Sequence, residues 1–460
     1  MGLRLAARPG LVHDGRVAAL LSLVLGITIS ADAYVRPPMP HAPATTTQVT
    51  QSYDIAATLD VGSGRLDVVE TMRITNLAGL PVSYLNVSVL PRAFGFYAPT
   101  GRLTVDGKRV ATRWTTGTNL RVGLGGRLAP GETATLRFPF RLTVGSAGGA
   151  FTARLSRDRG VISFGQWLPM VSPELDSYGV GDPRVTTSAE RITMDLRTTT
   201  ALRRDAVACP GLRHAPPASG TRWRCEIENA RDFSFVVNPR YRLTERTVDG
   251  IPMRVYTETV SGQRTADLAE SGLRRLNRLY GRYPWPDLML AEVGADGGFS
   301  MEYPAAIHLT RTKVVDPYVL YHEVAHQWFY AQLGNHQQRE PWLDEAFADF
   351  TARWLIGDPE RSQCSERPVD SPVFAWPAGR TTGGDWLSCD GYFHTVFYKG
   401  TEFLNAIRTA MGDRAFFGAL REHIADHRYG MTTARQLLAH LQARTDADLR
   451  PIFRRYLEAY

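Results

Sequence analysis

The spacing of apolar residues along this chain changes once, and that change limits the folds open to it. Between Tyr53 and Val144 apolar and polar residues alternate, clearly so across 134–144, which is the spacing of half-buried strands. Turn-forming pairs such as Asp106-Gly107 separate these runs. After Gly262 leucines recur at helical spacing instead. The sequence therefore predicts an N-terminal β region followed by a region rich in helices.

Length and composition agree with two folded domains. A chain of 460 residues exceeds what one hydrophobic core usually supports, and an apolar share of 43% is typical of globular proteins. We expect an α+β protein with its boundary near residue 248. An antiparallel β-sandwich or saddle domain is predicted over 52–247, and a domain of mixed sheet and helices over 248–460.

The distribution of charge argues against a nucleic-acid partner. The net charge of +7 arises from 53 basic and 46 acidic residues. These charges are scattered, and no window gathers five or six of one sign. A basic nucleic-acid-binding surface therefore has no support in the sequence.

The N-terminus has the pattern of an export signal. Arginines precede an apolar run at 17–29, which ends in the small-residue site Ala31-Asp32-Ala33. We predict a signal peptide over 1–33, a Pro-rich linker over 34–51, and a secreted protein without stable membrane insertion elsewhere. The alternative is an uncleaved membrane anchor, because the apolar run is of borderline length.

The four cysteines lie in two close pairs, Cys209 with Cys225 and Cys364 with Cys389. An even count in an exported chain favours two local disulfides. Four cysteines permit three pairings, and closeness in sequence favours this one. A cysteine-based zinc site has less support, because no Cys-x-x-Cys spacing occurs.

Two histidines four residues apart, His322 and His326, lie in a predicted helix that begins at Asp316 and ends at Gly334. Residues four apart share one helical face, so both imidazoles can reach one ion. Glu323 follows the first histidine and can approach a water at that ion. This arrangement predicts a catalytic zinc site with Glu323 as the general base.

The third protein ligand is predicted to be Glu345. It lies on a second helical segment, 341–356, and 18 residues separate it from His326. A turn at Gly334-Asn335 would let the two helices pack side by side. The alternative is a solvated glutamate on a helix face. We favour the ligand, in a site for one zinc ion, because a carboxylate buried beside two imidazoles needs a cation.

At these residues the sequence resembles the gluzincin metallopeptidases of the aminopeptidase N and leukotriene A4 hydrolase type. That family has the same two histidines around a glutamate and the same 18-residue gap to a ligand glutamate. The segment 297–304 looks like its Gly-x-Met-Glu-Asn strand, and 230–235 looks like the end of its β domain. The resemblance implies a thermolysin-like catalytic domain over 248–460, in a short form without the family's C-terminal helical domain.

The resemblance also implies a role for Glu302, because the family's corresponding glutamate binds the free α-amine of a peptide. A charged amine pairs well with a carboxylate in a cleft. The alternative is a glutamate that protects an edge strand from aggregation. Tyr303 stands where the family has asparagine, which keeps endopeptidase action open.

The family's oxyanion-stabilising tyrosine precedes a Lys-Gly pair by two residues, and here that position holds Phe397. Either Tyr398 or Tyr392 supplies the hydroxyl, or the donor is missing. We assign Tyr398 as the candidate; packing is its alternative role. Asp349 could orient a ligand histidine or be solvated, and Trp167 could line the substrate pocket or fill the core.

These expectations together describe a secreted zinc aminopeptidase that acts on short peptides. Two alternatives stay open. One is an endopeptidase, or a hydrolase of another small substrate. The other is a binding protein that retains zinc but has weakened catalysis, suggested by Phe397. The oligomeric state and the preferred side chains are not encoded in any pattern that we can interpret.

Overall fold

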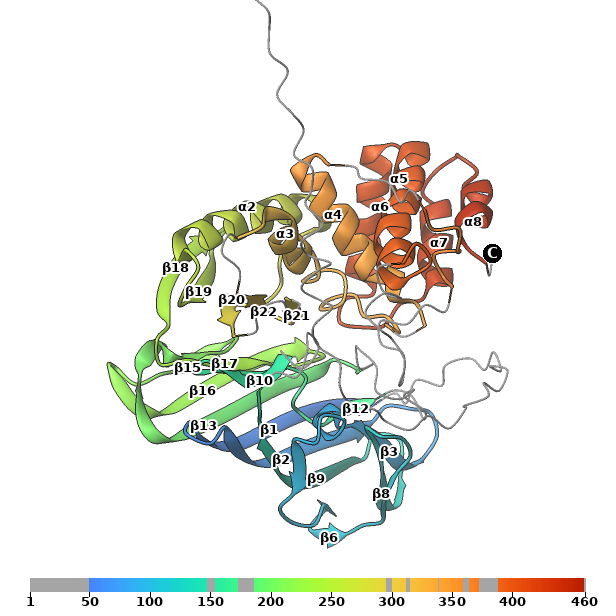
Figure 1. Ribbon diagram of the computed structural model, residues 1–460. Coiled ribbons are helices and arrows are strands. Elements are labelled where there is room, and N and C mark those ends of the chain that lie inside the picture. Colours follow the sequence, from blue (N-terminus) through green and yellow to red (C-terminus); the bar gives the residue numbers. More distant parts are fainter. Residues whose placement is uncertain are drawn as a thin grey trace, which may run out of the picture.

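The chain has a mixed α+β fold built from several sheets and a group of helices (Figure 1). The computed structural model describes residues 49–146, 154–172, 186–294, 300–311, 315–337, 339–358, 364–371 and 388–458. The predicted signal segment and most of the predicted linker lie outside these ranges. Strands fill one side of the molecule, and most helices gather on the other side (Figure 1).

The largest sheet has nine strands in the order β15-β16-β13-β1-β2-β9-β5-β6, with β4 paired to β9. One pairing departs from the antiparallel prediction, because β1 and β13 run parallel. Strands of the large sheet and of the two smaller sheets lie between β1 and β13 in sequence, so β13 can enter beside β1 in the same direction. The bounds are β1 Val49–Asp60, β2 Arg65–Asn76, β4 Tyr97–Pro99, β5 Thr104–Val105, β6 Lys108–Arg109, β9 Thr133–Thr143, β13 Ala189–Arg203, β15 Leu212–His214 and β16 Ser219–Ala230.

The two smaller sheets pack beside the large one and have four strands each. One has the order β12-β3-β8-β7 and the other the order β10-β11-β17-β14. Their strands are β3 Val82–Ser88, β7 Thr112–Trp114, β8 Asn119–Leu128, β10 Leu155–Asp158, β11 Val161–Phe164, β12 Met170–Ser172, β14 Val207–Ala208 and β17 Phe235–Val237.

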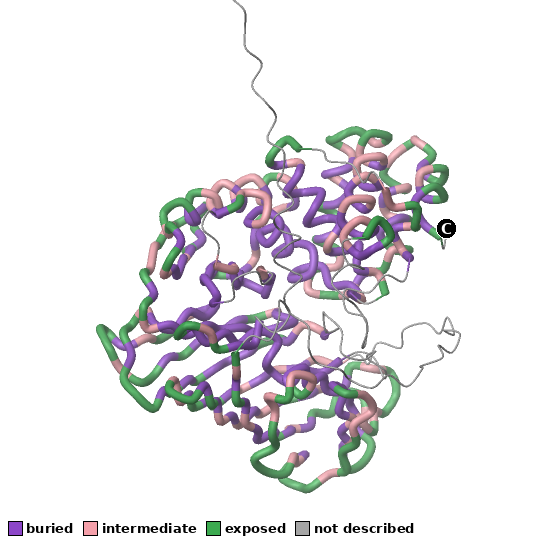
Figure 2. The backbone as a smooth tube through the Cα atoms, in the orientation of Figure 1, coloured by how far each residue is buried: buried purple, intermediate pink, exposed green. Residues whose placement is uncertain are grey.

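Alternation places one face of each long strand in the core, as the sequence predicted. The inward residues of β9 are buried, and so are Leu85 and Val87 of β3 (Figure 2). The predicted disulfide between Cys209 and Cys225 is present, with Cα atoms 6.3 Å apart. One cysteine directly follows β14 and the other lies in β16, so the disulfide closes a short loop within the β-rich part.

A fourth sheet carries the chain from the β-rich part into the helices. Its order is β18-β19-β20-β22-β21, and β19, β20 and β22 are parallel. The predicted helix after Ser261 is confirmed as α2 Gly262–Tyr280, which crosses from β19 to the parallel β20. The strands are β18 Arg242–Val248, β19 Ile251–Thr257, β20 Leu288–Val293, β21 Met301–Tyr303 and β22 Ala306–Thr310.

The remaining helices pack beside α2 and bury apolar faces against one another (Figures 1 and 2). They are α3 Pro317–Ala325, α4 Glu345–Ile356, α5 Lys399–Met411, α6 Asp413–Asp426, α7 Ala434–Gln442 and α8 Arg450–Tyr456. Among the described residues, no helix combines the length and hydropathy needed to cross a bilayer.

One buried arginine joins the β-rich part to the helical part. The Arg231 guanidinium, beyond the end of β16, donates to the carbonyls of Thr186, Gly430 and Ala331 at 3.0, 2.8 and 3.5 Å. Burial lowers its pKa to about 10. It packs against Gly334, where a Cβ atom would lie 2.1 Å from the guanidinium. The arginine therefore holds together segments from three distant parts of the sequence.

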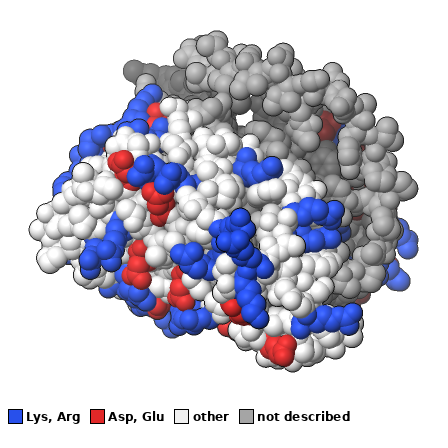
Figure 3. All heavy atoms as spheres, turned by 90° about the horizontal axis from the view of Figure 1, so that it is seen from below, with Lys and Arg blue, Asp and Glu red and all other residues white. Residues whose placement is uncertain are grey.

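The surface carries both signs of charge close together, as the scattered sequence charge predicts. Figure 3 shows basic and acidic side chains interspersed over one face of the molecule. Cross-strand ion pairs contribute to this mixture, since Arg224 lies 2.7 Å from Asp195 and Arg141 lies 2.6 Å from Asp67.

Candidate active site

Helix α3 carries His322 and leads directly into His326, and it begins where the sequence predicted. The Asp316 side chain caps it by accepting a hydrogen bond from the Tyr318 backbone amide at 2.9 Å, and Pro317 occupies the first turn. The helix ends at Ala325, so the prediction that it continues to Gly334 is wrong.

The segment after α3 is a buried, irregular loop, which explains that error. Trp328, Phe329 and Leu333 are buried, so their apolar pattern resembles that of a helix. Tyr330 has a φ of 103°, which no α-helix accommodates. The backbone is satisfied within the loop, as when the Ala331 amide donates to the His326 carbonyl at 3.0 Å.

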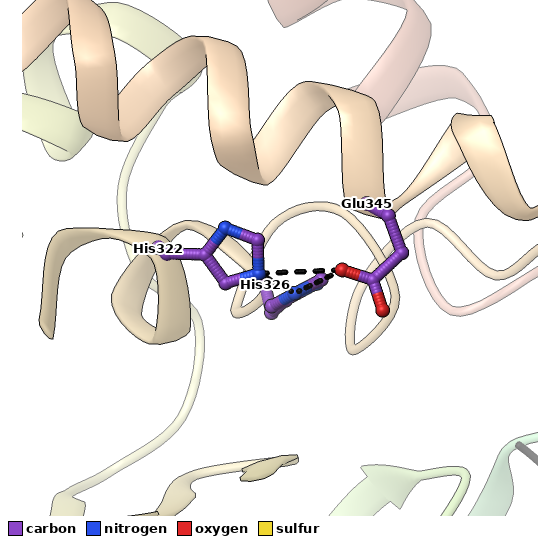
Figure 4. A group of neighbouring side chains, drawn as sticks. All are labelled: His322, His326 and Glu345. Atoms are coloured by element: carbon purple, nitrogen blue, oxygen red, sulfur yellow. Dashed lines mark hydrogen bonds and ion pairs between the residues drawn. The ribbon is translucent and has the colours of Figure 1, made fainter. Parts of the chain in front are cut away.

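Three side chains from α3, this loop and α4 converge on one point. The Nε2 atoms of His322 and His326 lie 3.0 Å apart. A carboxylate oxygen of Glu345 lies 3.3 Å from the first and 3.5 Å from the second. Figure 4 shows both imidazoles and the carboxylate pointing toward one another. The structure thus brings the three predicted ligands together, with ligand atoms within 4.8 Å of one another.

Two local hydrogen bonds orient these ligands. His326 Nδ1 lies 3.1 Å from the Phe329 carbonyl, which favours a proton on Nδ1 and turns Nε2 toward Glu345. Asp344 caps α4 by accepting from the Glu345 amide at 2.8 Å, and it also accepts from Gln337 at 2.7 Å. These contacts determine the directions from which His326 and Glu345 enter the site.

The pKa values of the clustered side chains show that their surroundings favour a positive charge among them. Burial alone would raise the pKa of Glu345, but hydrogen bonds from both histidines outweigh it and hold that pKa at about 2. Burial would lower the pKa of His326, but the carboxylates of Glu302 and Glu345 raise it to about 10. The same negative charge would stabilise a divalent cation in place of a proton.

Glu323 lies in the same buried pocket and is 5% exposed. Burial raises its pKa to about 7, against the lowering effect of the two histidines. Its Oε2 atom has no hydrogen-bond partner among the described residues. A buried carboxylate with an uncommitted oxygen beside the ligands has the chemistry of a proton acceptor for water.

The donor set fits zinc. Two imidazole nitrogens and one carboxylate are the ligands of a catalytic zinc site, which leaves a fourth position for water or substrate. The near-complete burial of His326 and the uncommitted oxygen on Glu323 match such a site. Within the residues the structure describes, these three side chains form the one group with metal-ligand spacing.

Glu302 lies on β21, at the edge of the fourth sheet, and pairs in register with Ile307 of β22. Although it is on an edge strand, it is only 7% exposed, which argues against a role in protecting that edge from solvent. Its carboxylate is close enough to raise the pKa of His326. The first residues of the predicted motif, 297–299, lie outside the described ranges.

The two candidate aromatic residues of the 396–400 segment face different neighbours. They belong to a π-helical turn, Phe393–Tyr398, that leads into α5. The Phe397 ring stacks on His322 with centroids 5.5 Å apart. The Tyr398 ring lies 4.9 Å from the Arg353 guanidinium and 5.0 Å from the His394 ring. Phe397 is thus the residue of this pair that packs on a predicted metal ligand.

Two further sequence expectations have clear outcomes. Asp349 does not bind a ligand histidine; its hydrogen bonds come from Tyr318, Arg353 and Thr401. These contacts join α4 to α3 and α5, so Asp349 supports the packing between these helices. Trp167 is fully buried and packs edge-on against Phe164 and Phe235, among other rings, which confirms the core interpretation over the pocket.

The second predicted disulfide is not formed. Cys364 and Cys389 are free thiols, and a hydrogen bond between them raises the pKa of Cys364 to about 11. Cys364 Sγ also lies 3.4 Å from His394 Nδ1. Closeness in sequence brought the two sulfurs together, as expected, but did not bond them.

Sequence reasoning missed two polar residues that organise the site. Asp344 precedes a helix, so an N-cap signal was available in the sequence. Gln327 follows His326 and is fully buried, with its amide bonded to the backbone beyond Glu302. No local pattern distinguishes such a glutamine from a solvated one.

Comparison with solved structures identifies the class to which this fold belongs. An M1 zinc metallopeptidase from Deinococcus radiodurans matches with a TM-score of 0.65 and 16% identity, covering 89% of this chain and 93% of that one. A mutant from the same organism, bound to a Tyr-Ser-Ala substrate, matches with a TM-score of 0.66, 17% identity and coverage of 89% and 94%. The fold is therefore that of the M1 zinc metallopeptidases.

Sequence comparison narrows the relationship, although no family model matches the chain. Aminopeptidase N of Lactobacillus helveticus is 24% identical over 245 residues, which are 47% of this chain and 29% of the relative. Aminopeptidase N of Lactobacillus delbrueckii subsp. lactis is 22% identical over 255 residues, or 49% and 30%. The match spans less than a third of either relative. Together with the fold, it confirms the predicted resemblance: this chain is related to the zinc metallopeptidases of the aminopeptidase N type.

Proposed function

We propose that this chain is a zinc aminopeptidase that hydrolyses the N-terminal peptide bond of short peptides. The convergence of His322, His326 and Glu345 beside the buried Glu323 carries the proposal. The fold similarity supports it, as does the Tyr-Ser-Ala substrate named for one structural neighbour. L-arginine, which also has a free amine, is bound in another neighbour of TM-score 0.65 and 18% identity.

Glu323 is the proposed general base. Zinc bound by the three ligands would polarise a peptide carbonyl and lower the pKa of an attacking water. Glu323 accepts the proton of that water on its uncommitted oxygen and returns it to the leaving amine. Burial in this pocket raises the pKa of Glu323, which helps the carboxylate to hold the proton between the two steps.

Glu302 is the proposed anchor for the substrate's free amine. An α-ammonium has a pKa of about 8, so it is mostly charged at neutral pH and pairs with a carboxylate. Glu302 lies near His326, which sets the amine at a short distance from the metal. Only the first peptide bond would then reach the attacking water.

Tyr398 is the proposed source of the oxyanion hydrogen bond, supported by its half-buried position next to Phe397 in the turn before α5. The stacking of Phe397 on His322 favours a second candidate, a zinc protein with weakened catalysis. The two are separated by paired variants. If Tyr398 is the donor, Tyr398→Phe lowers kcat by about 10²–10³-fold; if the donor is missing, Phe397→Tyr raises kcat and Tyr398→Phe leaves it unchanged.

The central experiment compares chromogenic aminoacyl substrates having a free amine with acetylated ones. Aminopeptidase action predicts cleavage of the free-amine substrates alone, and Glu302→Gln should raise their KM. Cleavage of acetylated peptides at a similar rate would instead identify an endopeptidase. Inactive wild-type protein containing one zinc per chain would favour the binding-protein alternative.

The proposal extends to the arrangement of the chain. A β domain over 52–247 would support a thermolysin-like domain over 248–460 that holds a single zinc ion, and the signal over 1–33 would direct the enzyme to secretion. Supporting this, the fourth sheet begins at Arg242, close to the predicted boundary. N-terminal sequencing of the secreted protein and metal analysis test these points.

A further inference from the structure

We propose that Gln327 is a positioning residue that holds Glu302 at a fixed distance from the metal ligands. The proposal rests on the proposed role of Glu302 as the amine anchor. Gln327 directly follows His326 and is fully buried. Its side chain reaches the turn between β21 and β22.

The amide of Gln327 binds that turn with both of its ends. Nε2 donates to the Tyr303 carbonyl at 3.0 Å, and Oε1 accepts from the Ala305 amide at 2.9 Å. Tyr303 follows Glu302, so the hydrogen bond acts one residue from the proposed anchor. One side chain therefore connects the metal-binding loop to the strand that carries Glu302.

Strand β21 is short, so side-chain contacts at its turn contribute to its position. Within the described residues it has three residues, lies at the edge of its sheet and pairs with β22. The turn that follows contains Pro304, which has no amide hydrogen, and Ala305, which has a φ of 56°. A left-handed alanine next to a proline persists only where its surroundings hold it.

The side chain of Tyr303 holds the same strand from the opposite side. It is fully buried and lies 4.7 Å from the His308 ring, measured between centroids. It packs so closely against Gly165 that a Cβ atom there would lie 1.9 Å from the tyrosine hydroxyl oxygen. The tyrosine that departs from the family's asparagine thus anchors β21 to the β-rich part, and Gln327 anchors it to the metal-binding loop.

Only a glutamine satisfies both backbone groups at this position. Glutamate would accept from Ala305 but place a second acceptor against the Tyr303 carbonyl. Methionine would match its length but leave a buried carbonyl and a buried amide without partners. Asparagine is one methylene shorter and cannot span the same gap. This requirement explains a buried polar residue beside a metal ligand that it does not contact.

A shift of β21 would move the proposed amine site relative to the reacting bond. Misplacing a substrate by about 1 Å can cost around 100-fold in rate, because the near-attack geometry is lost. We therefore expect Gln327 to control the preference for the first peptide bond, while the metal itself stays bound through His322, His326 and Glu345.

The test is a double-mutant cycle between Gln327→Met and Glu302→Gln, with zinc content and melting temperature measured for each variant. In the wild-type background Gln327→Met should lower kcat/KM for a free-amine substrate by roughly 10- to 100-fold, mostly through KM. In the Glu302→Gln background the same change should cost less than about twofold. Equal losses in both backgrounds would overturn the proposal, because a general packing defect does not depend on Glu302.

Gln332→Met is the matched control. Gln332 is another fully buried glutamine of the same loop, and its Nε2 donates to the Gln327 carbonyl at 3.2 Å without touching β21. It should lower the melting temperature about as much as Gln327→Met but leave KM near the wild-type value. A KM increase equal to that of Gln327→Met would contradict positioning through β21.

Ligand binding separates this proposal from the proposed activity. Calorimetry with L-arginine and Glu323→Gln protein measures amine binding without turnover. Weaker binding on adding Gln327→Met, but not Gln332→Met, supports positioning even if the wild-type enzyme cleaves no aminoacyl substrate. Unchanged L-arginine affinity in the Gln327→Met protein would sink the positioning role while leaving an active aminopeptidase intact.

Discussion

The nine-stranded sheet and the α3–α4 pair bury their residues for different reasons. Along β2 buried residues alternate with less buried ones, and those inside are mainly apolar, such as Leu66, Val68 and Met72. In α3 every residue from Leu320 to Ala325 is buried, including a histidine and a glutamate. Burial therefore stabilises the sheet, whereas in the helix pair the cost of burying polar groups offsets part of that stabilisation.

That difference teaches where changes should affect stability and where they should affect chemistry. A buried, incompletely satisfied polar group costs folding free energy, so it persists where it serves a function. We expect substitutions in the sheet to lower stability with catalysis intact. In the α3–α4 pair we expect substitutions to lower catalysis while stability changes little. The four predictions below test this contrast.

The largest effect is expected for Glu323→Gln. Removing the proton acceptor should lower kcat/KM by about 10²–10⁴-fold, because general acid–base catalysis contributes that much. Zinc content and melting temperature should stay near the wild-type values or rise, since a buried carboxylate is replaced by a neutral amide. The measurement is steady-state kinetics alongside metal analysis. Glu190→Gln, an exposed glutamate on β13, is the control.

The converse is expected for Leu66→Ala in the sheet. Leu66 is fully buried and pairs with Leu59 and Leu142 across β2. Loss of its side chain should cost about 2–5 kcal/mol of unfolding free energy through lost burial and a cavity, without a change in kcat. Urea unfolding measures the cost. Leu80→Ala should cost far less, because Leu80 is 76% exposed.

An intermediate effect is expected at the contact between two smaller sheets, where His308 of β22 lies 3.2 Å from the Ser163 hydroxyl of β11. Burial lowers the pKa of His308 to about 3. An unfolded histidine titrates near pH 6.5, so below that pH only the unfolded chain gains the proton. Stability should fall as pH drops from about 6.5 toward about 3, by up to about 1.4 kcal/mol per pH unit.

Unfolding of wild-type and His308→Gln proteins across that pH range measures this contribution. The variant lacks the titrating group, so its stability should depend less steeply on pH. Parallel curves for the two proteins would show that His308 is not a source of the acid sensitivity.

The smallest effect is expected on the outer face of the sheet. Arg224 and Asp195 form an exposed cross-strand pair 2.7 Å apart. Such pairs contribute about 0–1 kcal/mol, and salt screens them. A double-mutant cycle with alanine at both positions should give a coupling energy in that range, smaller at high salt. A coupling above 2 kcal/mol would contradict the view of this face as a solvated surface.

The sequence predicted much of the fold because its strongest patterns are local. Alternation identified β3 and β9, and helical spacing after Gly262 identified α2. The parallel β1–β13 pairing could not be predicted in this way, because it joins residues more than a hundred positions apart. Alternation is the same in parallel and antiparallel neighbours of a half-exposed sheet.

The convergence of the three candidate ligands was also predictable, since their spacing follows from helix geometry and a short connection. The end of α3 was not, because residues 326–335 are buried from all sides and their apolar residues no longer report helical spacing. Gln327 escaped notice for a related reason. Its partners are backbone groups of Tyr303 and Ala305, and backbone partners leave no signature in the sequence.

Arg231 has a consequence for how such a protein can be rebuilt. Its guanidinium, supplied from the β-rich half, replaces water at the carbonyls of Ala331 and Gly430 beneath the metal-binding loop. Consider a chimera in which the β-rich half is replaced by that of another protein. The loop after α3 would keep its position only if the new half placed an arginine where Arg231 lies. Exchange of segments between relatives is therefore restricted where Arg231 meets the helical half.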